Sequence, residues 1–303
     1  MSTDLMIDAT LDKRYGACVV LTGARLAVRR GSVHALVGEN GAGKSTMVKI
    51  LAGVVRGDRG ALAIAGRAVD VARWDRKAAR AAGVGIVQQH GASAGTLSVV
   101  ENAMLGIEPR RGPVLDLAPS ARALRALGDK VGLPVDPWAA AERLPLGAAQ
   151  RAEIVSALHN GARLLILDEP TAVLTPVEVD GLLHTLRALA AAGTTIVIVT
   201  HKLDEVRAVA DDVTVIRNGV TVTTFAAATD REPSDPRRLD VAAIARAMVG
   251  SDLPPPARVA APAANAPVLL EVAGISVGDE LRDVTLAVKA GEIVGVAGVD
   301  GNG

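Results

Sequence analysis

The sequence predicts an α/β protein built around a mostly parallel sheet, and three observations carry this prediction. Short apolar runs of β type alternate with stretches of helical periodicity. A glycine-rich loop joins one such run directly to a helical stretch, and acidic residues follow another run where its strand would end. The predicted strands are Ser32 to Val37, Ala61 to Ala65, Val84 to Gln88, Arg163 to Leu167, Thr195 to Thr200 and Val213 to Arg217.

The helix after the acidic run has a start that can be read in the sequence. Thr175 and Glu178 form a capping box around Pro176, which occupies the first helical position. The helical pattern runs through Ala192 and ends at Gly193. We therefore expect one long helix between two strands of the sheet.

The β pattern disappears between Ser98 and Leu144, and helical stretches replace it. Two of these stretches are Val99 to Leu105 and Ser120 to Lys130. This predicts a helical subdomain, over about residues 92–158, inserted into the α/β core.

Composition limits the classes of partner. The chain has 303 residues, and Lys+Arg and Asp+Glu both number 33, so no field of one sign attracts nucleic acid. Aromatic residues make up only 1%, which removes the stacking platforms of single-strand binders. One cysteine, Cys18, and no apolar leader predict a cytosolic chain, and its longest apolar runs are strand-sized.

The glycine-rich loop is a predicted phosphate site. It reads GENGAGKST, comprising Gly38, Glu39, Asn40, Gly41, Ala42, Gly43, Lys44, Ser45 and Thr46, and it lies between the strand VHALV and a helical run. Backbone N–H groups of such a loop converge on phosphate oxygens, and the helix adds its positive end. Lys44 would contact the β- and γ-phosphates of ATP, and Ser45 would bind Mg²⁺.

Three further polar residues fall at predicted strand ends. The run RLLIL delivers Asp168 and Glu169 to the carboxyl edge of the sheet, where ligands bind in open α/β folds. Asp168 would hold magnesium, and Glu169 would polarise the attacking water. His201 follows TTIVIVT, where a neutral imidazole can hydrogen-bond a γ-phosphate or that water.

The end of the chain is predicted to begin a second domain. Residues 251–267 are rich in proline and alanine, which favours an extended linker. Residues 268–303 repeat the pattern of the chain's opening, an apolar strand, a glycine turn, a second strand and the glycine-rich GVDGNG. We expect a truncated start of a second copy of the domain at 1–250.

The chain resembles the ATP-binding subunit of ABC transporters, specifically the double-ATPase type of simple-sugar and nucleoside importers. Five segments over residues 11 to 303 carry the resemblance in the family's order: GENGAGKST, VQQH, LPLGAAQR, LLILDEPTAVLTP and VTHKLDEV. It implies a P-loop NTPase domain of ABC type with an inserted helical subdomain and an N-terminal antiparallel β part.

The resemblance also implies roles for residues that spacing alone does not mark. Gln89 corresponds to the glutamine that senses magnesium and the attacking water, and Tyr15 falls where the family stacks a ring on adenine. Asp168 with Glu169 match Walker B, and His201 matches the switch histidine. The signature, which covers the ATP of an opposing ATPase domain, corresponds to Leu144 to Arg151 and begins Leu144, Pro145, Leu146, Gly147.

Two positions depart from the family pattern. Pro145 stands where a serine is usual and has neither the hydroxyl nor the N–H that would contact a γ-phosphate. Gly91 stands where a bulky apolar residue generally faces the membrane partner. We expect the Gly38 loop to hydrolyse ATP under a signature from the second domain, while the Pro145 signature covers a non-hydrolysing site.

The resemblance implies an ATPase peripheral to the cytoplasmic face of the cell membrane, with permease subunits as partners and an external solute-binding protein as an indirect one. A second ATPase domain or a second copy of the chain would complete the site. Two alternatives stay open: a tandem ATPase acting on ribosomes or DNA, and an ATP-binding fragment with little ATPase activity.

Overall fold

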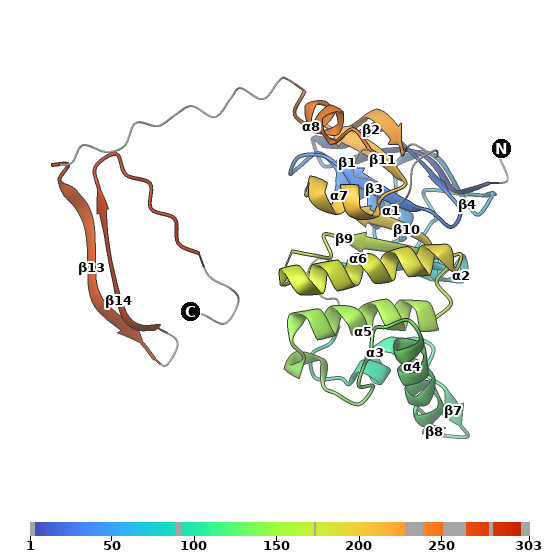
Figure 1. Cartoon of the computed structure of the whole chain (residues 1–303). Helices are drawn as coiled ribbons and strands as arrows, with labels where there is room; N and C mark the ends of the chain where they lie inside the picture. The colour runs from blue at the N-terminus through green and yellow to red at the C-terminus, as the bar shows by residue number, and fades with distance from the viewer. Residues whose placement is uncertain are drawn as a thin grey trace. The chain divides into compact units, whose positions relative to one another are not determined.

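A six-stranded sheet forms the centre of the first part of the chain (Figure 1). The computed structural model describes residues 4–88, 93–172, 174–227, 239–250, 265–278 and 281–297. The chain divides into two units, Met1–Asp252 and Leu253–Gly303. The predicted domain limits at 250 and 268 stay predictions, because residues 251–264 lie outside the described residues.

The central sheet is mostly parallel, as predicted. Its strand order is β12-β11-β3-β10-β9-β6, and β12 is the antiparallel edge strand. Val199 of β10 pairs with Asp168 of β9, so both strands end at the same edge. The strands are β3 (Val33–Val37), β6 (Val84–Val87), β9 (Leu164–Asp168), β10 (Thr195–Val199), β11 (Asp212–Arg217) and β12 (Val220–Ala226).

Every residue of β3, β9 and β10 is buried, because the sheet has an apolar layer on each face. Leu165 and Leu167 point into one layer, and Leu164 and Ile166 point into the other. The first layer includes residues from α6 (Pro176–Ala191), α7 (Leu203–Val209) and α8 (Val241–Val249), and the second from α1 (Lys44–Leu51) and α2 (Arg76–Ala81).

The expected antiparallel part is a four-stranded sheet with the order β2-β1-β4-β5. Its strands are β1 (Leu5–Tyr15), β2 (Cys18–Arg29), β4 (Arg59–Ile64) and β5 (Arg67–Val69). The strand predicted at Ala61 to Ala65 is present as β4 and belongs to this antiparallel sheet. A Cβ at Gly60 would lie 2.0 Å from the Thr10 carbonyl oxygen, so this glycine admits the close pairing of β4 with β1.

The inserted segment is mainly helical, as expected. It contains α3 (Val99–Met104), α4 (Ala118–Lys130), the 3-10 helix Ala141–Arg143 and α5 (Leu146–His159). The prediction of no β structure there was wrong, because β7 (Arg110–Arg111) and β8 (Val114–Leu115) form a small hairpin. Gly112, with a φ of 66°, supplies its left-handed turn, which helical periodicity does not reveal.

The capping box predicted for α6 is present. The Glu178 carboxylate accepts hydrogen bonds from the Thr175 N–H and hydroxyl at 3.1 and 2.9 Å. Ser98 and Glu101 form a second capping box, which starts α3. Within the described residues, no helix is long and apolar enough to cross a lipid bilayer.

The second unit contains an antiparallel pair, β13 (Val268–Val277) and β14 (Leu281–Lys289). Both strands are largely exposed, including the apolar side chains of Leu269 and Val277. The pair repeats the order of β1 and β2, which are strand partners in the first unit. The glycine-rich segment GVDGNG lies outside the described residues.

Candidate nucleotide site

The loop after β3 passes close to two neighbouring strands. A Cβ at position 38 would lie 2.1 Å from the carbonyl oxygen of Ile216 on β11. One at position 43 would lie 2.7 Å from Leu21 on β2, and Gly43 has a left-handed φ of 104°. Glycine is the residue that tolerates both the approach and the conformation. Gly38 and Gly43 thus set the path of the loop from β3 into α1.

Lys44, the first residue of α1, folds its side chain back over the loop. Its Nζ donates hydrogen bonds to the carbonyl oxygens of Gly38 at 2.8 Å and Glu39 at 3.0 Å. Burial lowers the pKa of the Lys44 ammonium, and the charges of Glu169 and Asp168 partly oppose this. A buried cation held by neutral carbonyls is well suited to exchange them for anionic oxygens.

The other residues of the loop can contact an anion through backbone groups rather than through a charged side chain. Glu39, Asn40 and Gly41 are exposed, whereas Ala42 is buried and its N–H donates to the Glu39 carbonyl at 3.1 Å. Thr46 is half-buried in the first turn of α1. An exposed loop leading into a helix start has the form of an anion site.

Ser45 and Asp168 come together although they are distant in sequence. The Ser45 hydroxyl donates to Asp168 Oδ1 at 3.3 Å, from the start of α1 to the end of β9. Burial raises the pKa of Asp168, while the Ser45 hydrogen bond opposes the rise. Hydroxyl and carboxylate oxygens are the hard ligands that Mg²⁺ takes. The described residues contain no group of three or more His, Cys, Asp or Glu placed to hold a metal. An ion here would therefore need phosphate and water ligands as well.

Glu169 and His201 also meet at this edge of the sheet. Glu169 Oε1 lies 3.3 Å from Nδ1 of His201, and the two side chains are 18% and 49% exposed. The Glu169 N–H donates to the carbonyl of Val199 at 2.9 Å, which ties the end of β9 to β10. Glu169 has a φ of 47°, a left-handed conformation that is uncommon for residues other than glycine. The sequence placed each residue at a strand end but did not show this contact.

The two residues after Glu169 contact further elements. The Pro170 carbonyl accepts a hydrogen bond from the Gln150 amide of α5, and the Thr171 hydroxyl donates one to the buried carboxylate of Glu205 on α7. Sequence reasoning assigned no role to Glu205, although it lies in the segment VTHKLDEV. The signal available was its position in the segment that follows His201, four residues further along the chain.

The signature segment forms the start of α5. Pro145 is the N-cap residue of α5, and Leu146 is 50% exposed. Proline and leucine side chains have no hydrogen-bond donor, so neither can donate to a ligand at this helix end. A Cβ at Gly147 would lie 2.7 Å from Glu178 Oε1, the end of a flexible side chain on α6. Leu144, just before the helix, lines a cavity described below.

Tyr15 lies at the tip of the hairpin that β1 and β2 form. It pairs with Cys18, three residues before Leu21, whose side chain lies beside Gly43 of the loop. The ring is 47% exposed, and Lys13 Nζ lies 5.2 Å from its centroid. Gln89 and Gly91, which the resemblance singled out, lie outside the described residues.

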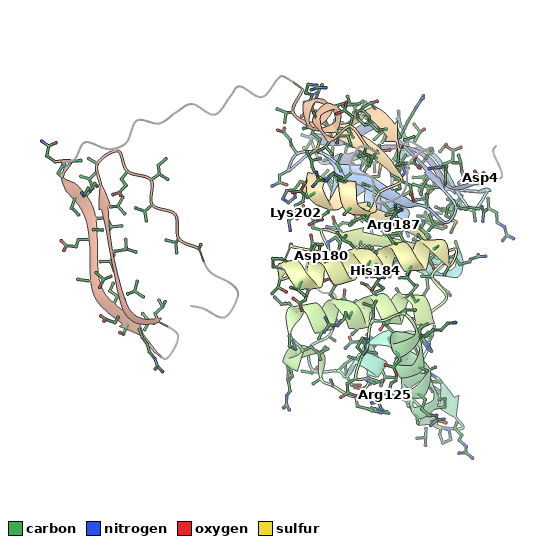
Figure 2. All side chains as sticks on the ribbon, viewed as in Figure 1. Asp4, Arg125, Asp180, His184, Arg187 and Lys202 are labelled. Atoms are coloured by element: carbon green, nitrogen blue, oxygen red, sulfur yellow. The ribbon has the colours of Figure 1, made fainter. Side chains whose placement is uncertain are left out.

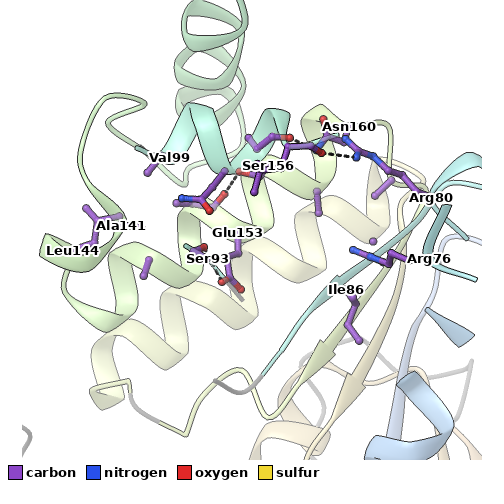
Figure 3. Close-up of a pocket in the computed structure, with 18 of the residues that line it drawn as sticks. Arg76, Arg80, Ile86, Ser93, Val99, Ala141, Leu144, Glu153, Ser156 and Asn160 are labelled. Carbon is purple, nitrogen blue, oxygen red and sulfur yellow. Dashed lines mark hydrogen bonds between the residues drawn. The ribbon is translucent and has the colours of Figure 1, made fainter. Parts of the chain in front are cut away.

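A cavity of about 490 Å³ separates the helical insertion from the central sheet (Figure 3). Residues of α3 and α5 line one side, and residues of α2 and β6 line the other. Arg80 reaches the carbonyl of Leu105 at 3.3 Å, and the Ser93 hydroxyl donates to Glu153 at 3.2 Å. Burial and the nearby charge of Arg80 lower the pKa of Arg76. The cavity is thus partly polar, with two cations at its sheet side.

Comparisons with known proteins match this chain to ATP-binding proteins of ABC transporters. A family model described as ABC transporter matches residues 21–172. The nucleoside import ATP-binding protein NupA of Lactococcus lactis is 39% identical over 98% of this chain and 57% of the relative. The ribose import ATP-binding protein RbsA 1 of Rubrobacter xylanophilus is 40% identical over 97% of this chain and 56% of the relative. The chain spans about half the length of these curated relatives.

Solved structures confirm the fold. The ADP conformation of MJ1267, an ATP-binding cassette of an ABC transporter, matches with a TM-score of 0.65 at 22% identity, covering 78% of this chain and 98% of that one. The structure of cbiO1 from Clostridium perfringens matches with a TM-score of 0.61 at 26% identity, covering 73% of this chain and 88% of that one.

Proposed function

Because the chain belongs to the ABC transporter family, we propose that it binds ATP with Mg²⁺ and hydrolyses the ATP to drive import of a simple sugar or a nucleoside. The observation that carries the proposal is the convergence of Lys44, Ser45, Asp168, Glu169 and His201 around one loop. Relatives named for nucleoside, guanosine and ribose import support this solute class.

On the binding side, Lys44 exchanges the carbonyls of Gly38 and Glu39 for the β- and γ-phosphates of ATP. Loop amides contact the phosphate oxygens, and Tyr15 stacks on adenine from the hairpin tip. Ser45 and Asp168 hold Mg²⁺, and Gln89 is a further candidate ligand from outside the described residues. When bound, the ion neutralises charge on the phosphate oxygens.

On the catalytic side, Glu169 orients the attacking water and takes its proton at the carboxylate. His201 Nδ1 lies 3.3 Å from Glu169 Oε1, and with ATP bound the single N–H of the neutral imidazole donates to the γ-phosphate. Gln89 reports the state of the ion and the water to the helical insertion that follows it.

We propose that these residues form one half of a composite site. The chain spans 57% of a relative's length, and residues 268–303 repeat the start of the first domain, so a second ATPase domain or a second copy would cover the Gly38 loop. The signature at Leu144, Pro145, Leu146 and Gly147 would cover the opposing site. Since Pro145 has no hydroxyl, that opposing site is proposed not to hydrolyse.

This finer proposal has its own test. In the intact protein, Pro145→Ser should leave the rate of ATP hydrolysis within about twofold of wild type, because the restored hydroxyl faces a site that does not turn over. A several-fold rise in the rate would contradict the assignment of the Pro145 signature to an idle site.

The partner that uses this energy is proposed to be a permease, with a solute-binding protein acting on its far side. The chain would then work at the cytoplasmic face of the cell membrane. The 490 Å³ cavity supports a permease contact, since it lies between the helical insertion and the sheet and is lined by Ser93, two residues after Gly91. Movement of the insertion would carry the ATP state to the permease.

The decisive experiment uses the intact protein assembled with its permease in vesicles. Glu169→Gln should reduce ATP hydrolysis and solute uptake by at least about 100-fold while ATP still binds. Asp8→Asn, which changes an exposed acid of β1 outside the insertion, is the control and should retain both.

The wild-type response separates the alternatives. A rate of ATP hydrolysis that does not change when permease and solute are added would favour a tandem ATPase acting on ribosomes or DNA. ATP binding with negligible hydrolysis would favour an ATP-binding fragment.

A further inference from the structure

Glu205 is a buried acid that the proposed mechanism leaves unused. It lies on α7 and only 4% of the residue is exposed, whereas the adjacent Asp204 side chain is 92% exposed. A buried carboxylate is costly unless hydrogen bonds and a counter-charge satisfy it. Its contacts therefore indicate what keeps it inside.

The Glu205 carboxylate joins two segments that β9 and β10 deliver. One oxygen accepts from the hydroxyl of Thr171, and the other accepts from the hydroxyl of Thr200 at 2.8 Å. Lys202, which Figure 2 labels, supplies the counter-charge, with Nζ 3.3 Å from Glu205 Oε1. The same Nζ donates to the Thr171 carbonyl at 3.2 Å. Both oxygens of the acid are thus engaged.

The two threonines are neighbours of the catalytic pair. Thr171 lies two residues after Glu169, and Thr200 lies directly before His201. Glu205 therefore bridges the two segments whose side chains meet at 3.3 Å in the site. Glu169 holds a left-handed φ of 47°, which an unsupported loop end would tend to lose.

A role in stability alone fits these contacts less well. A stabilising ion pair between Lys202 and Glu205, one helical turn apart, would not require hydroxyl donors from two other segments. Both donors come from segments that also carry the proposed catalytic groups, so the bridge fixes relative position. It contacts neither the loop at Gly38 nor the Lys44 ammonium among its described bonds.

We propose that Glu205 is a positioning residue for ATP hydrolysis. It holds the segment of Glu169 against the segment of His201, so that the carboxylate and the imidazole stay aligned for the attacking water. This inference rests on the proposed ATPase function, and it separates Glu205 from nucleotide binding.

The test compares five variants with wild type in the intact protein. Glu205→Gln and Thr171→Val should each lower kcat about tenfold, while the dissociation constant for ATP changes less than about twofold. Thr171→Ser, which keeps the hydroxyl, should restore kcat to within about twofold of wild type. The double variant should be no slower than either single one, because both remove the same bridge. Asp204→Asn is the matched control on α7 and should hydrolyse normally.

Hydrogen exchange gives a readout that does not depend on hydrolysis. In the 303-residue chain, Glu205→Gln should speed exchange of the Glu169 and Ala172 amides about tenfold and leave the amides of α1 unchanged. Unchanged exchange at both amides overturns the proposal even if the wild-type protein hydrolyses no ATP. The proposal is also overturned if Glu205→Gln or Thr171→Val weakens ATP binding as much as it lowers kcat, or if the double variant lowers kcat by the product of the two single effects.

Discussion

Replacing Lys44 by methionine keeps an unbranched side chain of similar length but removes its charge. In the structure, the ammonium donates to the carbonyls of Gly38 and Glu39 at 2.8 and 3.0 Å. With ATP bound, we expect it to exchange these two neutral acceptors for two phosphate oxygens. The loss of ATP-binding free energy in the variant is therefore the difference in strength between the phosphate bonds and the carbonyl bonds, and not the full strength of the phosphate bonds.

The size of this difference follows from typical hydrogen-bond strengths. Bonds that involve a charged group contribute about 1.5 to 3 kcal/mol each, and we place the carbonyl bonds near the lower value and the phosphate bonds near the upper one. The net loss over two bonds is then about 3 kcal/mol, which weakens ATP binding by about 100-fold.

The assay is equilibrium binding of a fluorescent ATP analogue with Mg²⁺ present. Lys77→Met, which removes an exposed lysine of α2, is the matched control and should bind as wild type does. Thermal unfolding of both variants checks that they fold. A change of less than about threefold in the dissociation constant of Lys44→Met would refute the exchange of carbonyls for phosphates.

Two further predictions concern His34 and Tyr15. Burial lowers the pKa of His34 from 6.5 to about 4, so between these pH values the unfolded chain binds a proton that the folded chain excludes. Stability should fall by about 3 kcal/mol as the pH drops from 7 to 4. Urea unfolding at several pH values should show this drop reduced in His34→Gln, and parallel curves would contradict it. Tyr15→Ala should weaken ATP binding by about 1 to 3 kcal/mol, the value of a stacked base, while Tyr15→Phe keeps the affinity. If Tyr15→Ala and Tyr15→Phe lose the same affinity for the fluorescent ATP analogue, stacking is excluded.

The parts of the fold that the sequence predicts well are those with a strong local signal. β3, β9 and β10 are buried on both faces, so they are continuous apolar runs in the sequence. The capping box of α6 depends on residues three apart. Strand direction has no such signal, so the sequence alone does not assign β4 to one of the two sheets. Its pairing with β1 depends on the backbone approach at Gly60, which no periodicity records.

The candidate site also combines residues that a local sequence signal predicts with contacts that no local signal reveals. Lys44, Ser45 and Asp168 follow from a motif and from strand ends, although the hydrogen bond between Ser45 and Asp168 joins residues 123 positions apart. Asp204 and Glu205 are adjacent acids in the sequence, yet one is exposed and the other is buried. Only the tertiary arrangement of α7 against the ends of β9 and β10 distinguishes them. The role of Gln89 stays a prediction.

Residues 168 to 171 each bond to a different residue: Asp168 to Ser45, Glu169 to His201, Pro170 to Gln150 and Thr171 to Glu205. In evolutionary terms, this short run accumulates four independent constraints. A substitution at Thr171 that removes its hydroxyl can be compensated only from α7, so related chains that lose one partner should have changed the other. The covariation expected here is pairwise, with single residues of α1, of α5 and of the segment from His201 to Glu205.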